Sequence, residues 1–268
     1  MPARGFVTSE GELIYFECWG EGGQSVVLGH GMGGSHAVWY QQVAHLAADY
    51  QVVTWDQRGF GRSTALTGDL GPVPAARDLK AILDHLDITQ AHIVGQSMGG
   101  WSALGFALDH PDRVLSLILA DTTAGLFTPR IRRVLDDYAK LIAASPPPEE
   151  WPLGFHPAVG TQLLTEDLAQ AFLYTQLGTL TDPPDPETII PLLMATDHTR
   201  RAAEVSAPTL FIVGENDPIF PPALIRSAAD LIDDSRVAVV ENTGHSPYFE
   251  RPETWNDIVA RFLQQSAS

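Results

Sequence analysis

The chain has 268 residues, 44% of them hydrophobic, so it can bury one large core but is too short for two full enzyme domains. Its formal net charge of −17 produces a field that repels polyanions, which argues against nucleic acid and anionic membrane surfaces as partners. Cys18 is the single cysteine, so the chain has neither an internal disulfide framework nor a cysteine cluster for a metal.

The first residues do not form a continuous apolar signal segment, because Glu10, Glu12 and Glu17 soon interrupt the apolar positions. No apolar run reaches the roughly twenty residues that a membrane-spanning helix needs. We therefore expect a soluble, cytoplasmic protein without a membrane partner. The sequence leaves the oligomeric state open.

Strands and helices alternate along the first 120 residues. Apolar runs rich in β-branched and aromatic residues predict strands over 13–19, 25–28, 51–55, 91–94 and 114–120. Helical spacing of apolar residues predicts helices over 36–48, 74–86 and 101–110. Continuous apolar strands between helices indicate an α/β fold, with a mostly parallel sheet covered on both faces.

The alternation stops between Asp121 and Ser206, where no strand is predicted. Apolar spacing indicates one helix over 131–142 and another over 164–172, and proline runs at 146–148 and 183–186 punctuate them. Strands over 208–213 and 236–240, with helices over 222–232 and 252–263, then resume the pattern. We therefore assign 1–123 and 207–268 to an α/β core, and 124–206 to a helical cap, or lid, over the catalytic face.

The stretch Gly95-Gln96-Ser97-Met98-Gly99-Gly100 joins a predicted strand to a predicted helix. In so tight a turn a side chain at Gly95 or Gly99 would crowd the neighbouring backbone, and Ser97 at the tip would be strained and exposed. This is the pattern of a nucleophile elbow. Because a chain of this composition produces the pattern by chance roughly one time in ten, a glycine-rich turn with an idle serine is the competing interpretation.

A serine hydroxyl needs a base and an orienting carboxylate to act as a nucleophile at neutral pH. Asp217 directly follows the predicted strand at 208–213, and His245 directly follows the one at 236–240. The order serine, aspartate, histidine is typical of α/β-hydrolases. Asp121 and Glu215 are alternatives for the carboxylate, and we favour Asp217.

Over nearly its whole length the chain resembles the α/β-hydrolase fold family, and within it the serine esterases and lactonases that carry a helical lid. His30-Gly31-Met32-Gly33 resembles the family's oxyanion loop, residues 56–63 its post-strand loop, and residues 95–100 its elbow. Asp217 and the pair Gly244-His245 complete the match. Five pieces in one order favour a catalytic serine over an idle one.

The resemblance implies that Ser97 is the nucleophile, that His245 is general base and then acid, and that Asp217 orients the histidine. It also implies an oxyanion hole formed by the backbone N–H groups of Met32 and Met98. An aspartate stands at the serine position in relatives that open epoxides or remove halide, so those reactions are disfavoured.

These roles predict a cofactor-free serine hydrolase that cleaves a small, largely apolar ester or lactone through an acyl-enzyme. Gly31, Gln96 and Trp101 neighbour the site in sequence and are candidates for substrate contacts. No spacing of histidines with acidic residues suggests a metal site.

Two other functions compete with ester hydrolysis. The elbow and the following residues 103–108 also resemble hydrolases that cleave carbon–carbon bonds of ring-cleavage (meta-cleavage) products. Those relatives usually carry an aromatic residue directly after the histidine, whereas Ser246 follows it here. The second alternative is a ligand receptor on the same fold with little turnover, which would retain the triad.

Charged groups and histidines outside the triad are expected to be structural. Asp56 and Arg58 lie close together in one loop; an anion site is one interpretation, and we favour a structural ion pair that fixes the loop. His30 is expected to brace its own loop. Substrate contact is the alternative for His156 and His198 in the predicted cap, and we favour solvated or structural roles for them. The histidines on predicted helices and strands have no visible partner: His36, His45, His85, His92 and His110.

Overall fold

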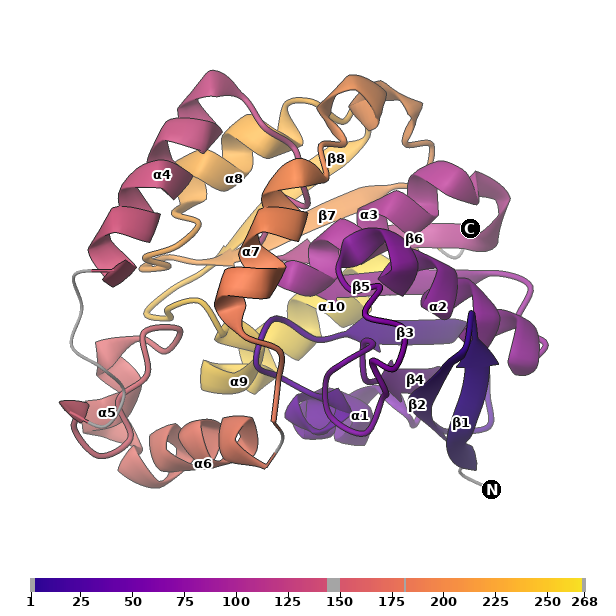
Figure 1. The fold of residues 1–268 in the computed structure, drawn as a ribbon, viewed down its shortest axis with the longest axis horizontal. Helices are drawn as coiled ribbons and strands as arrows, with labels where there is room; N and C mark the ends of the chain where they lie inside the picture. Colours follow the sequence, from indigo (N-terminus) through magenta and orange to yellow (C-terminus); the bar gives the residue numbers. More distant parts are fainter. Residues whose placement is uncertain (1–2, 144–149, 181, 267–268) are drawn as a thin grey trace.

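The computed structural model describes residues 3–143, 150–180 and 182–266 (Figure 1). These residues contain an eight-stranded sheet with the spatial order β1-β2-β4-β3-β5-β6-β7-β8. At one edge β2 pairs antiparallel with both β1 and β4, and every other pairing is parallel. The strands are β1 (Ala3–Ser9), β2 (Glu12–Trp19), β3 (Ser25–Gly29), β4 (Gln51–Trp55), β5 (Ala91–Gln96), β6 (Val114–Ala120), β7 (Thr209–Gly214) and β8 (Ser235–Val240). The predicted, mostly parallel sheet is confirmed.

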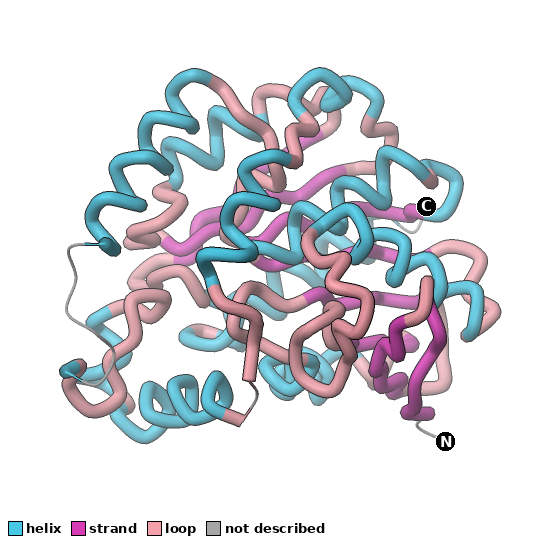
Figure 2. Tube along the Cα trace, in the orientation of Figure 1, coloured by secondary structure: helices cyan, strands magenta, loops and turns pink. Residues whose placement is uncertain are grey.

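Helices cover both faces of the sheet (Figure 2). One face packs under α2 (Pro72–His85), α3 (Met98–Asp109) and α8 (Pro222–Ala229), and the other under α1 (Tyr40–Leu46) and α10 (Pro252–Ser266). Two short 3-10 helices, η1 (His36–Trp39) and η2 (Pro111–Arg113), and the single-turn α9 (Pro247–Glu250) complete this part of the chain.

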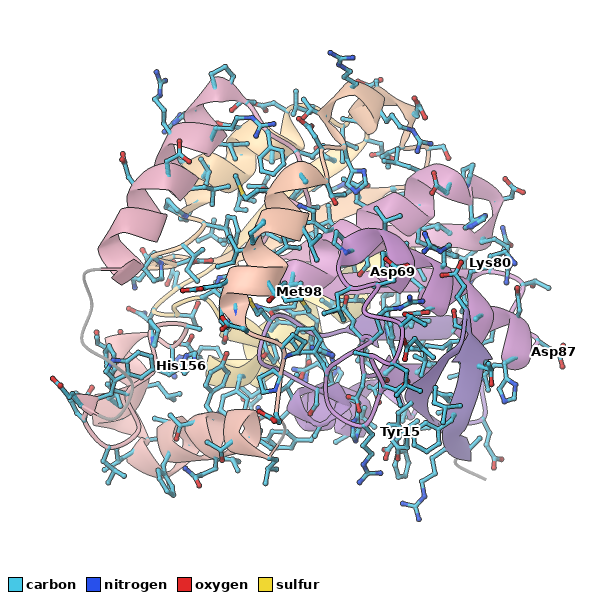
Figure 3. All side chains as sticks on the ribbon, viewed as in Figure 1. Tyr15, Asp69, Lys80, Asp87, Met98 and His156 are labelled. Carbon is cyan, nitrogen blue, oxygen red and sulfur yellow. The ribbon has the colours of Figure 1, made fainter. Side chains whose placement is uncertain are left out.

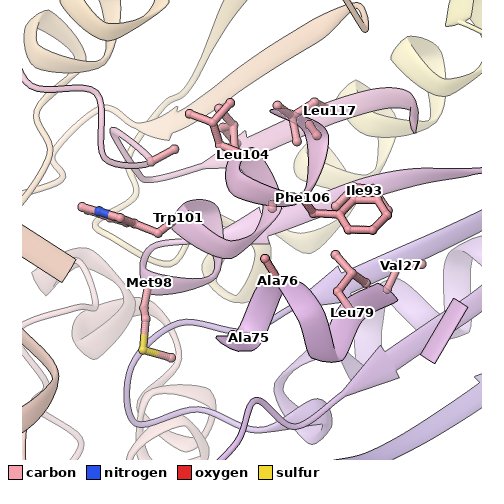
Figure 4. Close-up of a cluster of buried hydrophobic side chains, with 14 of the residues drawn as sticks. Val27, Ala75, Ala76, Leu79, Ile93, Met98, Trp101, Leu104, Phe106 and Leu117 are labelled. Atoms are coloured by element: carbon pink, nitrogen blue, oxygen red, sulfur yellow. The ribbon is translucent and has the colours of Figure 1, made fainter. Parts of the chain in front are cut away.

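Alternate residues of the parallel strands build two separate hydrophobic cores. Val27, Ile93 and Leu117 point to the side of α2 and α3 (Figure 4), whereas Val26 and Val94 belong to the core on the opposite side. Both sets are almost fully buried. The strands are therefore apolar at successive positions, which is why they read as continuous apolar runs in the sequence.

Between β6 and β7 the described residues form helices joined by loops, and we call residues 124–206 the helical segment. It contains α4 (Pro129–Ala143), α5 (Thr161–Glu166), α6 (Leu168–Thr179), α7 (Pro186–Ala195) and the 3-10 helix η4 (Thr199–Glu204). The helix predicted over 164–172 is interrupted at Asp167, whose side chain accepts the N–H of Gln170 and caps the start of α6.

Helix α7 was missed in the sequence, where the proline run at 183–186 was interpreted as punctuation. Pro186 instead occupies the first turn of α7, where a missing N–H costs nothing, and Asp185 caps it by accepting the N–H of Glu187. The other proline run, Pro146-Pro147-Pro148, lies outside the described residues.

Strand β1 was also missed in the sequence. It is an edge strand in which Val7 is the one buried apolar residue, while Phe6 is exposed, so its hydrophobic pattern is weak. Beside it in β2, Cys18 is buried, and burial raises the pKa of its thiol.

Within the described residues, every helix is too short or too polar to cross a bilayer.

Candidate active site

Ser97 lies at the turn between β5 and α3, with φ of 48° and ψ of −117°. A serine in this region is strained, and the surrounding backbone holds it there. Its N–H donates to the carbonyl of Ala120 at 2.9 Å. A Cβ on Gly95 would lie 2.4 Å from the carbonyl oxygen of Gly99, and one on Gly99 would lie 2.7 Å from that of Gly29. The crowding and the strain predicted for this turn are confirmed, and the Ser97 side chain is partly exposed.

His245 and Asp217 follow β8 and β7, are buried, and contact each other. His245 Nδ1 lies 2.8 Å from Asp217 Oδ2. Asp217 Oδ1 accepts the backbone N–H groups of Ile219 at 2.8 Å and Phe220 at 3.0 Å, so its carboxylate is held in one orientation. A carboxylate only accepts hydrogen bonds, so the proton of the neutral imidazole lies on Nδ1 and the lone pair on Nε2. That is the tautomer a general base needs.

The two alternative carboxylates bond to other groups. Asp121 is fully buried with φ of 49°, and its Oδ1 accepts the N–H of Gly214 at 2.9 Å. Burial first, and then the charge of Asp217, raise the pKa of Asp121 well above its usual range, which favours its protonated form. Glu215 is exposed and accepts the N–H of Asn242 at 3.0 Å.

The same cluster is the place where a metal ion would find ligands. Within the described part of the chain, Asp121, Asp217 and His245 form the group whose ligand atoms all lie within 4.8 Å of one another. Nδ1 of His245 is already bonded to Asp217, so an ion at this point would compete with that bond.

The loop after β3 packs against the elbow. A Cβ on Gly31 would lie 2.1 Å from Gln96 Oε1 and 3.1 Å from Ser97 Cβ, so Gly31 is directly beside the serine. The next residue, Met32, is 40% exposed, whereas Met98 is buried at the start of α3 (Figure 3). Because α3 begins at Met98, its N–H has no acceptor within the helix and lies at the positive end of the helix dipole.

His30 holds this loop in place. The ring is fully buried, with Nδ1 donating to the carbonyl of Gly31 at 2.7 Å and Nε2 accepting the N–H of Gln57 at 3.0 Å. Burial lowers the pKa of His30 and keeps the ring neutral. The bracing role predicted for His30 is confirmed.

The predicted ion pair between Asp56 and Arg58 is wrong, because the loop carries the two side chains to different elements. Arg58 donates to the buried Asp78 of α2, with 2.7 Å between Nε and Oδ2. Asp56 lies 2.9 Å from Nδ1 of His36. His36 therefore has a partner, contrary to expectation, and so does His92, which bonds to a serine hydroxyl on β6.

Two of the candidates for substrate contact bond within the protein. Gln96 is buried, and its Nε2 donates to the carbonyl of His245 at 3.1 Å. Trp101 is buried, and its Nε1 donates to the carbonyl of Leu193 in α7 at 3.0 Å. Gln96 thus links the elbow to residues 241–246, which carry His245 and which we call the histidine loop. Trp101 links α3 to the helical segment.

Several residues around His245 were missed in the sequence, because they meet only in the folded chain. The ring of Phe220 lies 5.7 Å from that of His245. The hydroxyl of Tyr174 in α6 lies 2.8 Å from that of Ser246. Glu250 accepts the N–H of Gly244. One local signal was present for Glu250, namely an acidic residue within an otherwise apolar turn shortly after the histidine.

His156 of the helical segment also belongs to this neighbourhood (Figure 3). Its ring lies 5.1 Å from the ring of Tyr174, and its Nδ1 accepts the N–H of Ala158 at 3.1 Å. Burial, and then the charge of His245, lower the pKa of His156 to about 4. The ring is therefore neutral at pH 7 and carries its proton on Nε2.

Comparisons with known proteins point to hydrolases. Residues 24–252 match the family model of the alpha/beta hydrolase fold. A protein of Azorhizobium caulinodans named carbamate hydrolase RutD is 30% identical over 256 residues, covering 93% of this chain and 94% of that protein. A 2-hydroxy-6-oxononadienedioate/2-hydroxy-6-oxononatrienedioate hydrolase of Escherichia coli is 30% identical over 275 residues, covering 94% and 91%. The structure of a thermophilic esterase from Thermogutta terrifontis matches over 100% of both chains, with a TM-score of 0.79 and 25% identity.

Proposed function

Because the chain belongs to the α/β-hydrolase fold family, we propose that it is a serine hydrolase that cleaves ester or lactone bonds of a small, largely apolar substrate. The observation that carries this proposal is the buried bond of 2.8 Å between His245 Nδ1 and Asp217 Oδ2, in a chain that also holds Ser97 strained at an elbow. The likeness to a thermophilic esterase supports the choice of bond.

The reaction uses side chains and backbone groups of the chain alone. His245 Nε2 takes the proton of Ser97 as its hydroxyl oxygen attacks the substrate carbonyl, and Asp217 stabilises the imidazolium that forms. The N–H groups of Met32 and Met98 bind the negative oxygen of the tetrahedral intermediate. The alcohol leaves with the proton from His245, and water, activated by the same nitrogen, then hydrolyses the acyl-enzyme.

We assign the choice of substrate to the helical segment, acting as a cap on a core formed by residues 1–123 and 207–268. Two hydrogen bonds support this assignment: Trp101 of the elbow helix donates to α7, and Tyr174 of α6 bonds to Ser246 beside His245. A segment in contact with both the elbow helix and the loop of His245 is suited to enclose a substrate between them.

A second candidate is cleavage of a carbon–carbon bond next to a carbonyl, and the 30% identity to the Escherichia coli hydrolase over most of the chain favours it. Carbamate cleavage, suggested by the name of the Azorhizobium relative, is acyl transfer with a nitrogen in the leaving or retained group. Ser246 weighs against the carbon–carbon reaction, because it stands where the relatives with that activity usually carry an aromatic residue.

A substrate panel tests these candidates together. We would assay p-nitrophenyl esters of increasing acyl length, a lactone series, a carbamate and a coloured dienoate ring-cleavage product. Ester or lactone turnover that falls by several orders of magnitude in Ser97→Ala supports the proposal. Dienoate turnover without action on esters would support the second candidate, and tight ligand binding with negligible turnover would support a receptor. Full ester hydrolysis by Ser97→Ala would overturn the assignment of the nucleophile.

A further inference from the structure

Glu250, at the end of α9, is a buried carboxylate that gathers backbone N–H groups from two parts of the chain. Both of its oxygens lie 3.0 Å from the nitrogen of Gly244, and Oε1 lies 3.3 Å from that of Ser246. Oε2 also accepts the N–H of Gly160, in the helical segment, at 3.0 Å. One carboxylate thus joins both neighbours of His245 to the helical segment.

Gly160 and Gly244 touch main chain to main chain. A Cβ on Gly160 would lie 2.9 Å from the nitrogen of Gly244, and a Cβ on Gly244 would lie 2.5 Å from the nitrogen of Gly160. Neither residue has room for a side chain. The contact therefore depends on a close fit of two backbones, and a shift of the helical segment by one atomic radius would break it.

Side-chain bonds join the same two parts of the chain close by. The hydroxyls of Tyr174 and Ser246 lie 2.8 Å apart, and Gln170 of α6 donates to the carbonyl of Phe249. The contact at Glu250 differs from these because its carboxylate is shared. If Gly160 moves away, the buried acceptor loses a charge-assisted bond, and the histidine loop loses part of what holds it.

We propose that Glu250 is a positioning residue that keeps His245 aligned with Asp217 only while the helical segment is seated on the histidine loop. The proposal rests on the proposed function, since it takes His245 as the base. His245 would then become aligned as a base at the moment when the helical segment packs onto the histidine loop. Proton transfer is therefore efficient only when a substrate is enclosed.

Protonation of Glu250 gives a second way to release the loop. Burial raises the pKa of Glu250, while its bonds to the N–H groups of Gly244, Gly160 and Ser246, followed by the charge of Arg251, oppose the rise. The charge of Glu250 in turn contributes to the raised pKa values of Asp121 and Tyr174. A proton on either oxygen of Glu250 places an O–H donor where an N–H group is now accepted, so the bonds to the histidine loop and the helical segment weaken as the pH falls.

The decisive variant is Gly160→Ala, compared with Gly178→Ala as a matched control. Gly178 lies in the same segment, where the nearest atom to an added Cβ would be the carbonyl oxygen of Gly33 at 3.9 Å. With p-nitrophenyl acetate, a substrate too small to need the cap for binding, we expect Gly160→Ala to lower kcat about 10- to 100-fold with KM little changed. Gly178→Ala should remain within about twofold of the wild type.

Glu250→Gln supplies an independent readout, because its amide keeps the shape but places N–H groups against N–H donors. We expect a similar loss of kcat, together with a change in the pH profile of kcat/KM. The acid limb of the wild type should include the protonation of Glu250, and the limb of the variant should be less steep because that contribution is missing. A purely structural role for Glu250 would lower the melting temperature without changing the steepness of this limb.

The results separate this proposal from the proposed function. Unchanged kcat in Gly160→Ala, with Ser97→Ala inactive, would overturn the role of Glu250 and leave the hydrolase assignment intact. If Gly160→Ala does not fold, judged by the loss of a cooperative thermal transition, Glu250→Gln decides: unchanged kcat and an unchanged acid limb refute the proposal. Full activity in Ser97→Ala would instead refute the catalytic assignment itself.

Discussion

Two carboxylates lie beside His245, and their surroundings give them different tasks. Asp217 accepts two backbone N–H groups and the imidazole N–H, which hold its carboxylate in one orientation. Asp121 accepts one N–H, and its Oδ2 is buried without a hydrogen-bond partner among the described residues. Burial and the neighbouring charge of Asp217 favour the form of Asp121 that keeps its proton.

Replacing each carboxylate by its amide tests this division. Asp217→Asn should lower kcat about 10⁴-fold, because the amide favours the wrong tautomer of His245. Asp121→Asn resembles the protonated acid and should stay within about tenfold of the wild type. Steady-state kinetics on one ester checks both variants. A larger loss in Asp121→Asn than in Asp217→Asn would reverse the assignment of the orienting carboxylate.

The pH dependence of stability tests the protonation of Asp121. The pKa of Asp121 in the folded chain is raised above 3.8, its ordinary value, which it has in the unfolded chain. At a pH between the unfolded and the folded pKa, the unfolded chain therefore binds fewer protons at this residue than the folded chain does. The free energy of unfolding of the wild type should therefore fall as the pH rises through this window. Asp121→Asn lacks this contribution, so its melting temperature relative to the wild type should increase from pH 4 to pH 7. A constant difference across that range would contradict a raised pKa.

For single residues, the sequence predicts the position in the fold wherever the residue belongs to a local motif. Ser97 directly follows β5, and Asp217 and His245 lie in the loops that follow β7 and β8, so their positions could be predicted one at a time. Glu250 could not be recognised in this way, because one of its partners, Gly160, is 90 residues distant along the chain. The true partners of Asp56 and Arg58 were missed for the same reason.

The elbow is an element in which glycines are required by the packing of the turn rather than by a preference for helix or strand. An added Cβ on Gly95, Gly99 or Gly100 would lie less than 3 Å from another atom. For Gly95 and Gly99 that atom is a backbone oxygen, and for Gly100 it belongs to the side chain of Thr122. Later in α3, an added Cβ on Gly105 would make ordinary contacts, 3.4 Å from the ring of His198 and 3.8 Å from the Cβ of Ala76. The elbow and the body of its helix should therefore respond differently to the same substitution.

We predict that Gly99→Ala lowers the free energy of unfolding by about 1–3 kcal/mol or more, because the backbone oxygens it meets cannot withdraw cheaply. Gly105→Ala is the control within the same helix, and alanine's better helix propensity should leave it unchanged or more stable by up to about 1 kcal/mol. Urea denaturation of both variants measures the difference. Equal stability of the two would mean that the turn can relax around a side chain.

Helices and strands with a strong hydrophobic periodicity were predicted well from the sequence. Those whose conformation depends on tertiary contacts with other elements were not. Strand β5 and helix α3 are buried on all sides and carry continuous apolar runs. Edge strand β1 has one buried apolar residue, and α7 contains Pro191 within its length, which propensity alone disfavours. In both cases tertiary contacts decide the conformation, as the bond from Trp101 to α7 illustrates.

The whole molecule carries a formal charge of −17, and like charges at that density repel one another across the surface. Screening shortens this repulsion, since the Debye length falls from about 30 Å at 0.01 M salt to about 10 Å at 0.1 M. We therefore predict that the melting temperature at pH 8 rises by roughly 2–4 °C over this range, equivalent to about 1 kcal/mol for a chain of this size. Calorimetry near the isoelectric point is the control, where the same salt step should have little effect.

The buried thiol of Cys18 has a practical consequence for following the helical segment. It is the single cysteine of the chain, it lies inside β2, and its raised pKa keeps it in the unreactive thiol form. A cysteine introduced at Leu173, a position of α6 that is 40% exposed, would consequently be the preferred target of a maleimide dye without removal of the native residue. Fluorescence from that one label would report in real time whether α6 leaves the histidine loop between turnovers.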